Sequence, residues 1–242
     1  MSTNQHRKTP AARDAQSRAP KPASAGVFRI VLVDDHPMVR ERLAEVINAA
    51  RDLSVCGEAE DARDAFAVIE KTKPHLAIVD LSLKTTFGLD LIHELRARHP
   101  KVALLVLTMY ESPLYAERAL RAGALGYLTK RDATTKILEA VRSVLDGQPY
   151  LSEALAPRVA AALAIHGRSE DEPALARLSD RELQVLRMLG DGRKTRQIAD
   201  ALHVDVRTVE TYRGRIKEKL DLKDGLDLLR YAIEWKGRGE AI

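Results

Sequence analysis

The sequence predicts an α/β domain with a parallel sheet, followed by a smaller domain made only of helices. Apolar runs of strand length alternate with segments of helical spacing from Phe28 to Gly147. From Leu178 onward the helical spacing continues without a strand signal. A chain of 242 residues is long enough for two such domains.

Each expected strand of the first domain is a short apolar run. The five expected strands are 28–34, 53–60, 75–80, 101–108 and 124–130. The first, third and fourth are apolar almost throughout, which is typical of central strands. A helix follows each strand, at 36–50, 61–73, 88–99, 113–123 and 132–147. This alternation predicts a parallel sheet with helices on both faces.

The composition of the chain suggests further boundaries. Residues 1–26 contain no Leu, Ile, Val or aromatic residue and carry a net charge of +4, which predicts a disordered basic tail. We expect the α/β domain to span residues 27–147. Residues 148–176 would be a linker with a connecting helix, polar at 167–174. The helical domain would span residues 177–242.

Charge and cysteine content restrict the partners and the compartment. Residues 27–176 carry a net charge of −3 and residues 177–242 a net charge of +3, so nucleic acid is a candidate partner of the second domain. The single cysteine, Cys56, excludes a disulfide framework or a cysteine metal cluster and fits a reducing cytoplasm. No signal peptide or membrane span is evident, so we expect a soluble cytoplasmic protein with no membrane partner.

Polar side chains follow four of the expected strands where each strand ends. Asp34 and Asp35 end the first strand, Asp80 the third, Thr108 the fourth and Lys130 the fifth. The carboxyl ends of parallel strands meet at one edge, where open α/β sheets bind their ligands. Such a set suits Mg²⁺ and phosphoryl transfer to a carboxylate. Each residue alone would be an ordinary turn or capping residue, but five in register favour a site.

This set, together with the segment GYLTK, resembles the receiver domain of bacterial two-component response regulators over residues 28–146. The resemblance implies five parallel strands in the flavodoxin-like order 2-1-3-4-5. It implies that Asp80 accepts a phosphoryl group from a partner histidine kinase. Asp35, Asp80 and the backbone carbonyl of Ser82 would bind Mg²⁺, while Asp34 would act mainly through water.

The resemblance also assigns roles to the rest of the site. Lys130 would contact the phosphoryl group. Thr108 and Tyr127 would form a switch pair, in which the hydroxyl moves toward the phosphoryl group and the aromatic ring turns inward. The sequence departs from the family pattern at Leu83-Lys84 and at Arg131, where Met-Pro and Pro are common. These departures concern the conformation of the loops and not the phosphorylation chemistry.

The C-terminal domain carries the signals of a helix-turn-helix. A capping-box signature, Ser179 with Glu182, starts its first helix. Two short helices follow, one at 195–202 with Thr195 as its expected N-cap and one at 206–220. The tight turn between them is typical of a helix-turn-helix.

The helix at 206–220 has an apolar stripe on one face and polar side chains on the other. Five basic and two acidic side chains occur between residues 207 and 219, a pattern that a solvated amphipathic helix would also show. Gly214 in the middle of the polar face favours a binding role. A glycine there costs about 1 kcal/mol of helix stability and makes sense where a partner must approach the backbone closely.

The segment LSDRELQVLRMLGDGRKTRQIADALHVDVRTVETYRGRIKEKL is similar to the LuxR-type DNA-binding domain. With the receiver domain, it matches the NarL/FixJ class of response regulators. The resemblance implies a double-stranded DNA operator as partner, with the helix at 206–220 in the major groove. Candidates for base or nearby contacts are Arg207, Thr208, Thr211 and Arg215, and candidates for phosphate contacts are Lys194, Thr195, Arg213 and Lys217.

Glu210 would accept a hydrogen bond from cytosine or be a neutral rim residue. The helix at 224–235 resembles the family's dimerisation helix, or it simply covers the core.

These observations predict a transcription regulator, not a turnover enzyme, that is switched by phosphorylation of Asp80 and autodephosphorylates. Phosphorylation would alter domain packing and favour a homodimer, and RNA polymerase would be a further partner. The opposite charges of the two domains suggest that the unphosphorylated receiver masks the recognition helix.

Other functions remain open at this point. A regulator that binds DNA without using phosphorylation is one, although the intact Asp, Thr and Lys set argues against it. A Mg²⁺-dependent aspartyl-phosphate hydrolase with Asp34 as nucleophile is another, but such enzymes typically carry a second Asp where this chain has His36. A quorum-type regulator is disfavoured because the whole chain contains only three Phe and one Trp.

Overall fold

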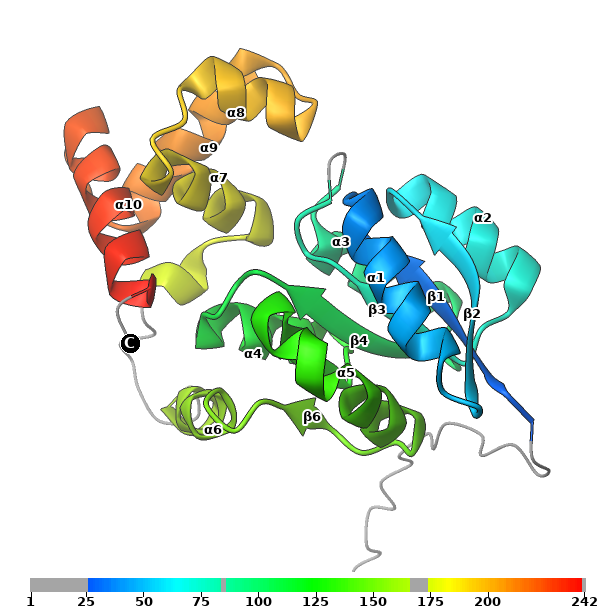
Figure 1. Ribbon diagram of the computed structural model, residues 1–242. Helices are drawn as coiled ribbons and strands as arrows, with labels where there is room; N and C mark the ends of the chain where they lie inside the picture. Colours follow the sequence, from blue (N-terminus) through cyan, green and yellow to red (C-terminus); the bar gives the residue numbers. More distant parts are fainter. Residues whose placement is uncertain (1–25, 84–85, 166–173, 241–242) are drawn as a thin grey trace, which may run out of the picture.

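The computed structural model describes residues 26–83, 86–165 and 174–240 (Figure 1). Of the expected basic tail only Gly26 is described, and of the expected polar linker only Ala174, so the rest of both segments lies outside the described residues. Among the described residues, no helix is long and apolar enough to cross a lipid bilayer.

One parallel sheet, in the order β2-β1-β3-β4-β5-β6, forms the centre of the α/β domain. Its strands are β1 (Phe28–Val33), β2 (Leu53–Ala59), β3 (Leu76–Val79), β4 (Ala103–Thr108), β5 (Gly126–Thr129) and β6 (Tyr150–Leu151). The order of the first five strands is confirmed, but the prediction of five strands in total is wrong. β6 pairs with β5 at the edge of the sheet, in the segment expected to connect the domains. Two residues are too few to show the period by which a strand is recognised.

The helices cover both faces of the sheet, as predicted. They are α1 (Pro37–Asn48), α2 (Ala62–Thr72), α3 (Gly88–Arg98), α4 (Pro113–Ala122) and α5 (Lys130–Leu145). α1 and α5 pack on one face, and α2, α3 and α4 pack on the other (Figure 1). β3 and β4 are buried along their whole length, which is the burial that their continuous apolar sequence requires.

The rest of the chain is helical. α6 (Ala156–Ile165) packs on α4, and a 3-10 turn (Ala174–Arg177) leads into the second domain. The helices of this domain are α7 (Asp180–Gly190), α8 (Thr195–Leu202), α9 (Val206–Lys219) and α10 (Gly225–Glu240). α8 and α9 form the predicted helix-turn-helix. The predicted cap of α8 is wrong, because Lys194 is the N-cap and Thr195 is the first helical residue.

Glu182 joins the start of α7 to the end of α9. Its backbone N–H donates to Ser179 Oγ (3.3 Å), and its carboxylate accepts from the Ser179 N–H (2.7 Å), so the predicted capping box is confirmed. The same carboxylate, only 2% exposed, pairs with Lys219 Nζ at 2.6 Å. Burial raises the pKa of Glu182, but the hydrogen bonds from Lys219 and Ser179 outweigh it and bring the pKa below its usual value.

We predict that Glu182→Gln destabilises the helical domain in a pH-dependent way. A folded-state pKa below the ordinary value of 4.5 means that the ionised group stabilises the fold above that pH. This contribution is lost as the pH falls through the folded-state pKa. The variant should lower the free energy of unfolding by about 1–2 kcal/mol at neutral pH, and the difference should shrink as the pH falls below about 4. Urea unfolding across this range measures it, with the exposed Glu218→Gln as the control. A difference that stays constant with pH would contradict the prediction.

Candidate functional site

The predicted site residues meet at the carboxyl edge of the sheet. Asp34 and Asp35 follow β1, Asp80 follows β3, Thr108 ends β4, and Lys130 begins α5 directly after β5. The three carboxylates are 3%, 8% and 2% exposed, respectively. A parallel sheet delivers all four strand ends to the same edge, so the predicted cluster exists as a spatial unit.

Lys130 is the charge that holds two of these carboxylates together. Its Nζ lies 2.6 Å from Asp34 Oδ2 and 2.7 Å from Asp80 Oδ2. Burial raises the pKa of Asp80, and the negative charge of Asp34 raises it further, while Lys130 opposes both. Burial acts to lower the pKa of Lys130, but the charges of Asp80 and Asp34 reverse this, so its pKa is raised. The ammonium therefore stays charged between the two carboxylates.

The Asp34–Asp35 pair is held by groups that the sequence did not single out. Arg40 donates to the backbone carbonyl of Asp34 at 2.6 Å and pairs with Glu58 (3.0 Å) and with Glu60, which fixes the end of β1 against β2. The His36 N–H donates to Asp34 Oδ1 at 2.9 Å, and its ring Nδ1 lies 2.7 Å from Asp35 Oδ1. Of these groups, only His36 could have been expected near the site from the sequence, because it directly follows the acidic pair.

The donor set fits a hard divalent cation. One ligand atom each from Asp34, Asp35, His36 and Asp80 lie within 4.8 Å of one another. Asp35 Oδ1 is buried and, despite the nearby His36 ring, has no hydrogen bond of acceptable geometry among the described residues. Three carboxylates facing one ammonium leave excess negative charge, which suits Mg²⁺. The Ser82 N–H donates to Asp80 Oδ1 at 3.1 Å, while the proposed role of the Ser82 carbonyl remains a prediction.

Tyr110 connects the two predicted switch residues. Its N–H donates to the buried Thr108 Oγ1 at 3.4 Å, and its carbonyl accepts from Tyr127 OH at 2.6 Å. The Tyr127 ring is fully buried, so it already points inward. Tyr110 also stacks on Tyr115, with 4.7 Å between the ring centroids. Sequence reasoning missed Tyr110, whose only signal is its place two residues after Thr108.

The second domain contacts the α/β domain through α7 and the segment before it. The Arg187 guanidinium lies 4.1 Å from the centroid of the Tyr110 ring. Arg118 of α4 donates to Asp180 Oδ1 at 2.6 Å and to the carbonyls of Leu178 (2.7 Å) and Leu175 (3.0 Å). Figure 1 shows α7 on the side of the helical domain that faces the α/β domain. The domains are thus joined next to the candidate switch.

The helix-turn-helix presents the predicted DNA-contacting residues on α9 and at the start of α8. α9 packs on α7, α8 and α10. Exposed residues of the predicted set are Lys194, Arg207, Glu210, Thr211, Gly214 and Arg215, and half-buried ones are Thr195, Thr208, Arg213 and Lys217. A Cβ added to Gly214 would meet nothing within 4 Å, so its surface is open to a partner. The Arg213 side chain, by contrast, turns against α8, where it donates to Thr195 Oγ1 at 2.6 Å.

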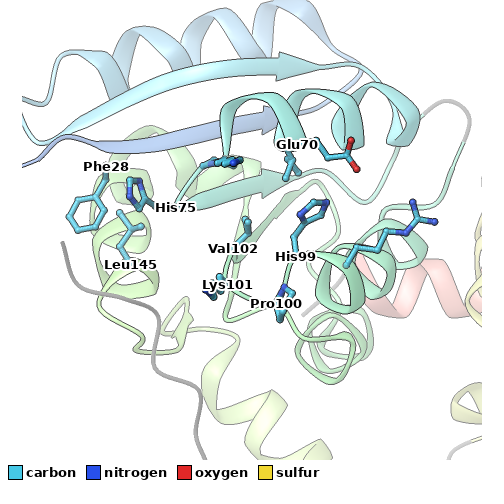
Figure 2. A pocket seen from close by; sticks show the side chains of 12 residues that line it. Phe28, Glu70, His75, His99, Pro100, Lys101, Val102 and Leu145 are labelled. Atoms are coloured by element: carbon cyan, nitrogen blue, oxygen red, sulfur yellow. The ribbon is translucent and has the colours of Figure 1, made fainter. Parts of the chain in front are cut away.

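A separate cavity of about 500 Å³ opens at the opposite edge of the sheet, where the strands begin. Figure 2 shows Phe28 and His75 at one end of it and His99 at the other, with Val102 between them. α2, α3 and α5 all end near this cavity. Basic residues such as Lys73 complement the negative ends of the helix dipoles there, so its charges have a structural explanation. None of the candidate site residues at the carboxyl edge of the sheet lines it.

A parallel α/β domain with this acidic edge, joined to a helix-turn-helix domain, defines a DNA-binding response regulator. Residues 30–142 match the response regulator receiver domain family, and residues 176–232 match the bacterial regulatory proteins of the luxR family. The chain belongs to the NarL/FixJ class of two-component response regulators.

Named proteins match the chain over most of its length. The chain is 34% identical to the oxygen regulatory protein NreC of Staphylococcus haemolyticus, covering 86% of this chain and 98% of NreC. It is 31% identical to the response regulator UvrY of Escherichia coli K12, covering 86% and 94%. Among solved structures, RcsB of Salmonella enterica serovar Typhimurium, bound to promoter rprA in the presence of the phosphomimetic BeF₃⁻, matches with a TM-score of 0.61, 25% identity and coverage of 86% and 98%.

We predict that Lys130→Met strongly destabilises the receiver domain in metal-free buffer. The substitution leaves Asp34 and Asp80 buried beside each other without their shared counter-charge, which should lower the free energy of unfolding by about 3 kcal/mol. Urea unfolding measures the change. Arg42→Met, which removes an ion pair that is 68% exposed on both sides, should change stability by less than about 0.5 kcal/mol. Equal stability of Lys130→Met and the wild type would refute the structural role of this ammonium.

Proposed function

We propose that this response regulator is phosphorylated on Asp80 by a cognate histidine kinase in the cytoplasm, with Mg²⁺ as cofactor, and that phosphorylation controls its action on transcription. The observation that carries the proposal is the buried acidic edge, where Lys130 bridges Asp34 and Asp80 while a buried oxygen of Asp35 has no hydrogen bond within the described part of the chain. Such an arrangement suits a divalent metal ion and places an ammonium beside the carboxylate that would react.

In the proposed reaction, an Asp80 oxygen attacks the phosphorus of a phosphohistidine. The new O–P bond forms as the P–N bond breaks, and the bonding electrons return to the imidazole. Asp34, Asp35, Asp80 and the Ser82 carbonyl would hold Mg²⁺, which when bound neutralises phosphoryl oxygens. Lys130 is placed to exchange part of its contact with Asp80 for a phosphoryl oxygen. Hydrolysis of the acyl phosphate by water would then return Asp80 to its resting state.

The arrangement does not favour Asp34 as the nucleophile of a hydrolase. His36 occupies the place at which such enzymes typically carry their second Asp. Asp80 therefore remains the better phosphoacceptor, and autodephosphorylation rather than turnover accounts for the loss of its phosphoryl group.

Phosphorylation can be tested directly by intact mass. Incubation with acetyl phosphate and Mg²⁺ should add one phosphoryl group to the wild-type chain and none to Asp80→Asn. Chelation of the metal should abolish the gain, because the phosphoryl oxygens would then face an uncompensated acidic cluster. If neither acetyl phosphate nor a kinase modifies the protein, a DNA-binding regulator that does not use phosphorylation becomes the better description.

We further propose how the site communicates with the DNA-binding domain. Masking of the recognition helix was expected, but the contacts between the domains involve Arg181, Arg187 and the segment 175–180, while the polar face of α9 is exposed. The masking hypothesis therefore gives way to a contact through α7. Movement of the Thr108 hydroxyl toward a phosphoryl group would break its bond with the Tyr110 N–H, and a shift of Tyr110 would weaken its contact with Arg187.

This coupling predicts that Arg187→Gln makes the receiver easier to activate. If the contact with Tyr110 stabilises the unphosphorylated arrangement, its loss must favour binding of a phosphoryl mimic by the same free energy. A cation–π contact contributes about 0.5–2 kcal/mol, so beryllofluoride with Mg²⁺ should bind about 2- to 30-fold more tightly to the variant. Isothermal titration calorimetry measures this, with Arg230→Gln on α10 as a control. Identical affinities in all three proteins would rule out the coupling.

The helical domain supports the proposed partners. Arg207, Thr211 and Arg215 are exposed on α9, where they could reach base edges or phosphates of an operator.

On α10, Leu226, Leu229 and Ile233 are 64%, 37% and 52% exposed. Their spacing places them on one side of the helix, which supports a homodimer of the active form. Control of transcription implies RNA polymerase as a further partner.

A further inference from the structure

The junction of α8 and α9 contains a closed set of polar contacts. Arg213 NH1 donates to Glu210 Oε1 at 2.9 Å and to Thr195 Oγ1 at 2.6 Å. The Thr195 hydroxyl in turn lies 3.0 Å from Glu210 Oε1. One carboxylate oxygen is therefore shared by a guanidinium from its own helix and a hydroxyl from the neighbouring helix.

The two donors in this set are of the kind that binds DNA phosphates. Arginine guanidinium and threonine hydroxyl groups commonly donate to phosphate oxygens. In the free protein, Glu210 already accepts hydrogen bonds from both of these donors. Its side chain is 53% exposed, whereas that of Arg213 is 24% exposed. The anion thus lies on the outer side of the pair, where DNA would approach.

The guanidinium of Arg213 is not fully used by its present partners. Its Nε is buried and has no hydrogen-bond partner among the described residues. Its hydrogen bonds to Thr195 and Glu210 both come from NH1. A guanidinium carries five N–H donors in a fork that matches a phosphate better than a single carboxylate oxygen does.

We propose that Glu210 is an internal counter-ion, which occupies Arg213 and Thr195 in the free protein and is displaced by a DNA phosphate on binding. Glu210 is then a positioning residue that limits backbone affinity, rather than a reader of cytosine or a neutral rim residue. This inference rests on the DNA-binding function of α8 and α9. Release of Glu210 is inexpensive because its side chain is half-exposed and regains water.

The salt dependence of binding distinguishes this role from a structural one. Each phosphate neutralised by the protein contributes about −0.9 to the slope of log K against log salt concentration. Glu210→Gln keeps an oxygen that can accept from Arg213 and Thr195 but removes the competing charge. The slope for this variant should be steeper by about one, with several-fold tighter binding at low salt.

The experiment measures fluorescence anisotropy of a short random-sequence duplex with full-length protein over a series of salt concentrations. Glu218→Gln is the matched control, because it makes the same charge change on an exposed position of α9. The double variant Glu210→Gln/Arg213→Gln should lose the gain, because the released guanidinium is then absent. Glu210→Ala, which removes the acceptor as well as the charge, provides a second variant, and thermal unfolding confirms that each variant folds.

The possible outcomes separate the inference from the function on which it rests. An equal gain in Glu218→Gln, or a gain that survives in the double variant, would mean a general effect of net charge and would overturn the counter-ion role. An unchanged slope in both Glu210→Gln and Glu210→Ala would overturn it as well. Absence of DNA binding by the wild type would instead overturn the DNA-binding function itself.

Discussion

The two ion pairs of Lys130 allow buried carboxylates to gather at the carboxyl edge of the sheet. Parallel strands β1 and β3 end side by side, and an aspartate follows each of them, so their pairing brings two carboxylates into a buried space. Without a shared cation, that burial would cost several kcal/mol. Because Lys130 is the first residue of α5, the packing of this helix and the balance of charge at the site depend on one another.

Tyr110 gives the same edge a connection to the second domain. Its backbone forms hydrogen bonds with Thr108 and Tyr127, the proposed switch pair, while its ring faces Arg187 of α7. Backbone and side chain of a single residue thus belong to two different sets of contacts. A displacement of Tyr110 that changes its backbone hydrogen bonds also changes the contact of its ring with Arg187. Such linked contacts favour two discrete arrangements over a gradual change.

The sequence predicted the features that depend on local period and on topology. The site lies at the strand ends, so the sequence alone was enough to place its residues together, namely Asp34, Asp35, Asp80, Thr108 and Lys130. β6 was missed because Tyr150–Leu151 is too short to show a period. The contacts of Arg118 and Arg187 were missed because nothing near them in the sequence marks a partner in the other domain. Thr195 looked like a helix cap, but its hydroxyl is engaged by Glu210 and Arg213 of another helix.

The position of α4 has a consequence for how the chain tolerates change. α6 packs on α4, and Arg118 of α4 also holds the carbonyls of Leu175 and Leu178. The elements on either side of residues 166–173, namely α6 and the 3-10 turn, are therefore both held by α4. Closing a longer segment between fixed ends adds only about 0.6 kcal/mol for each doubling of its length. A longer connection between residues 165 and 174 should therefore change stability little, as long as the contacts of α4 with α6 and with Leu175 and Leu178 are kept.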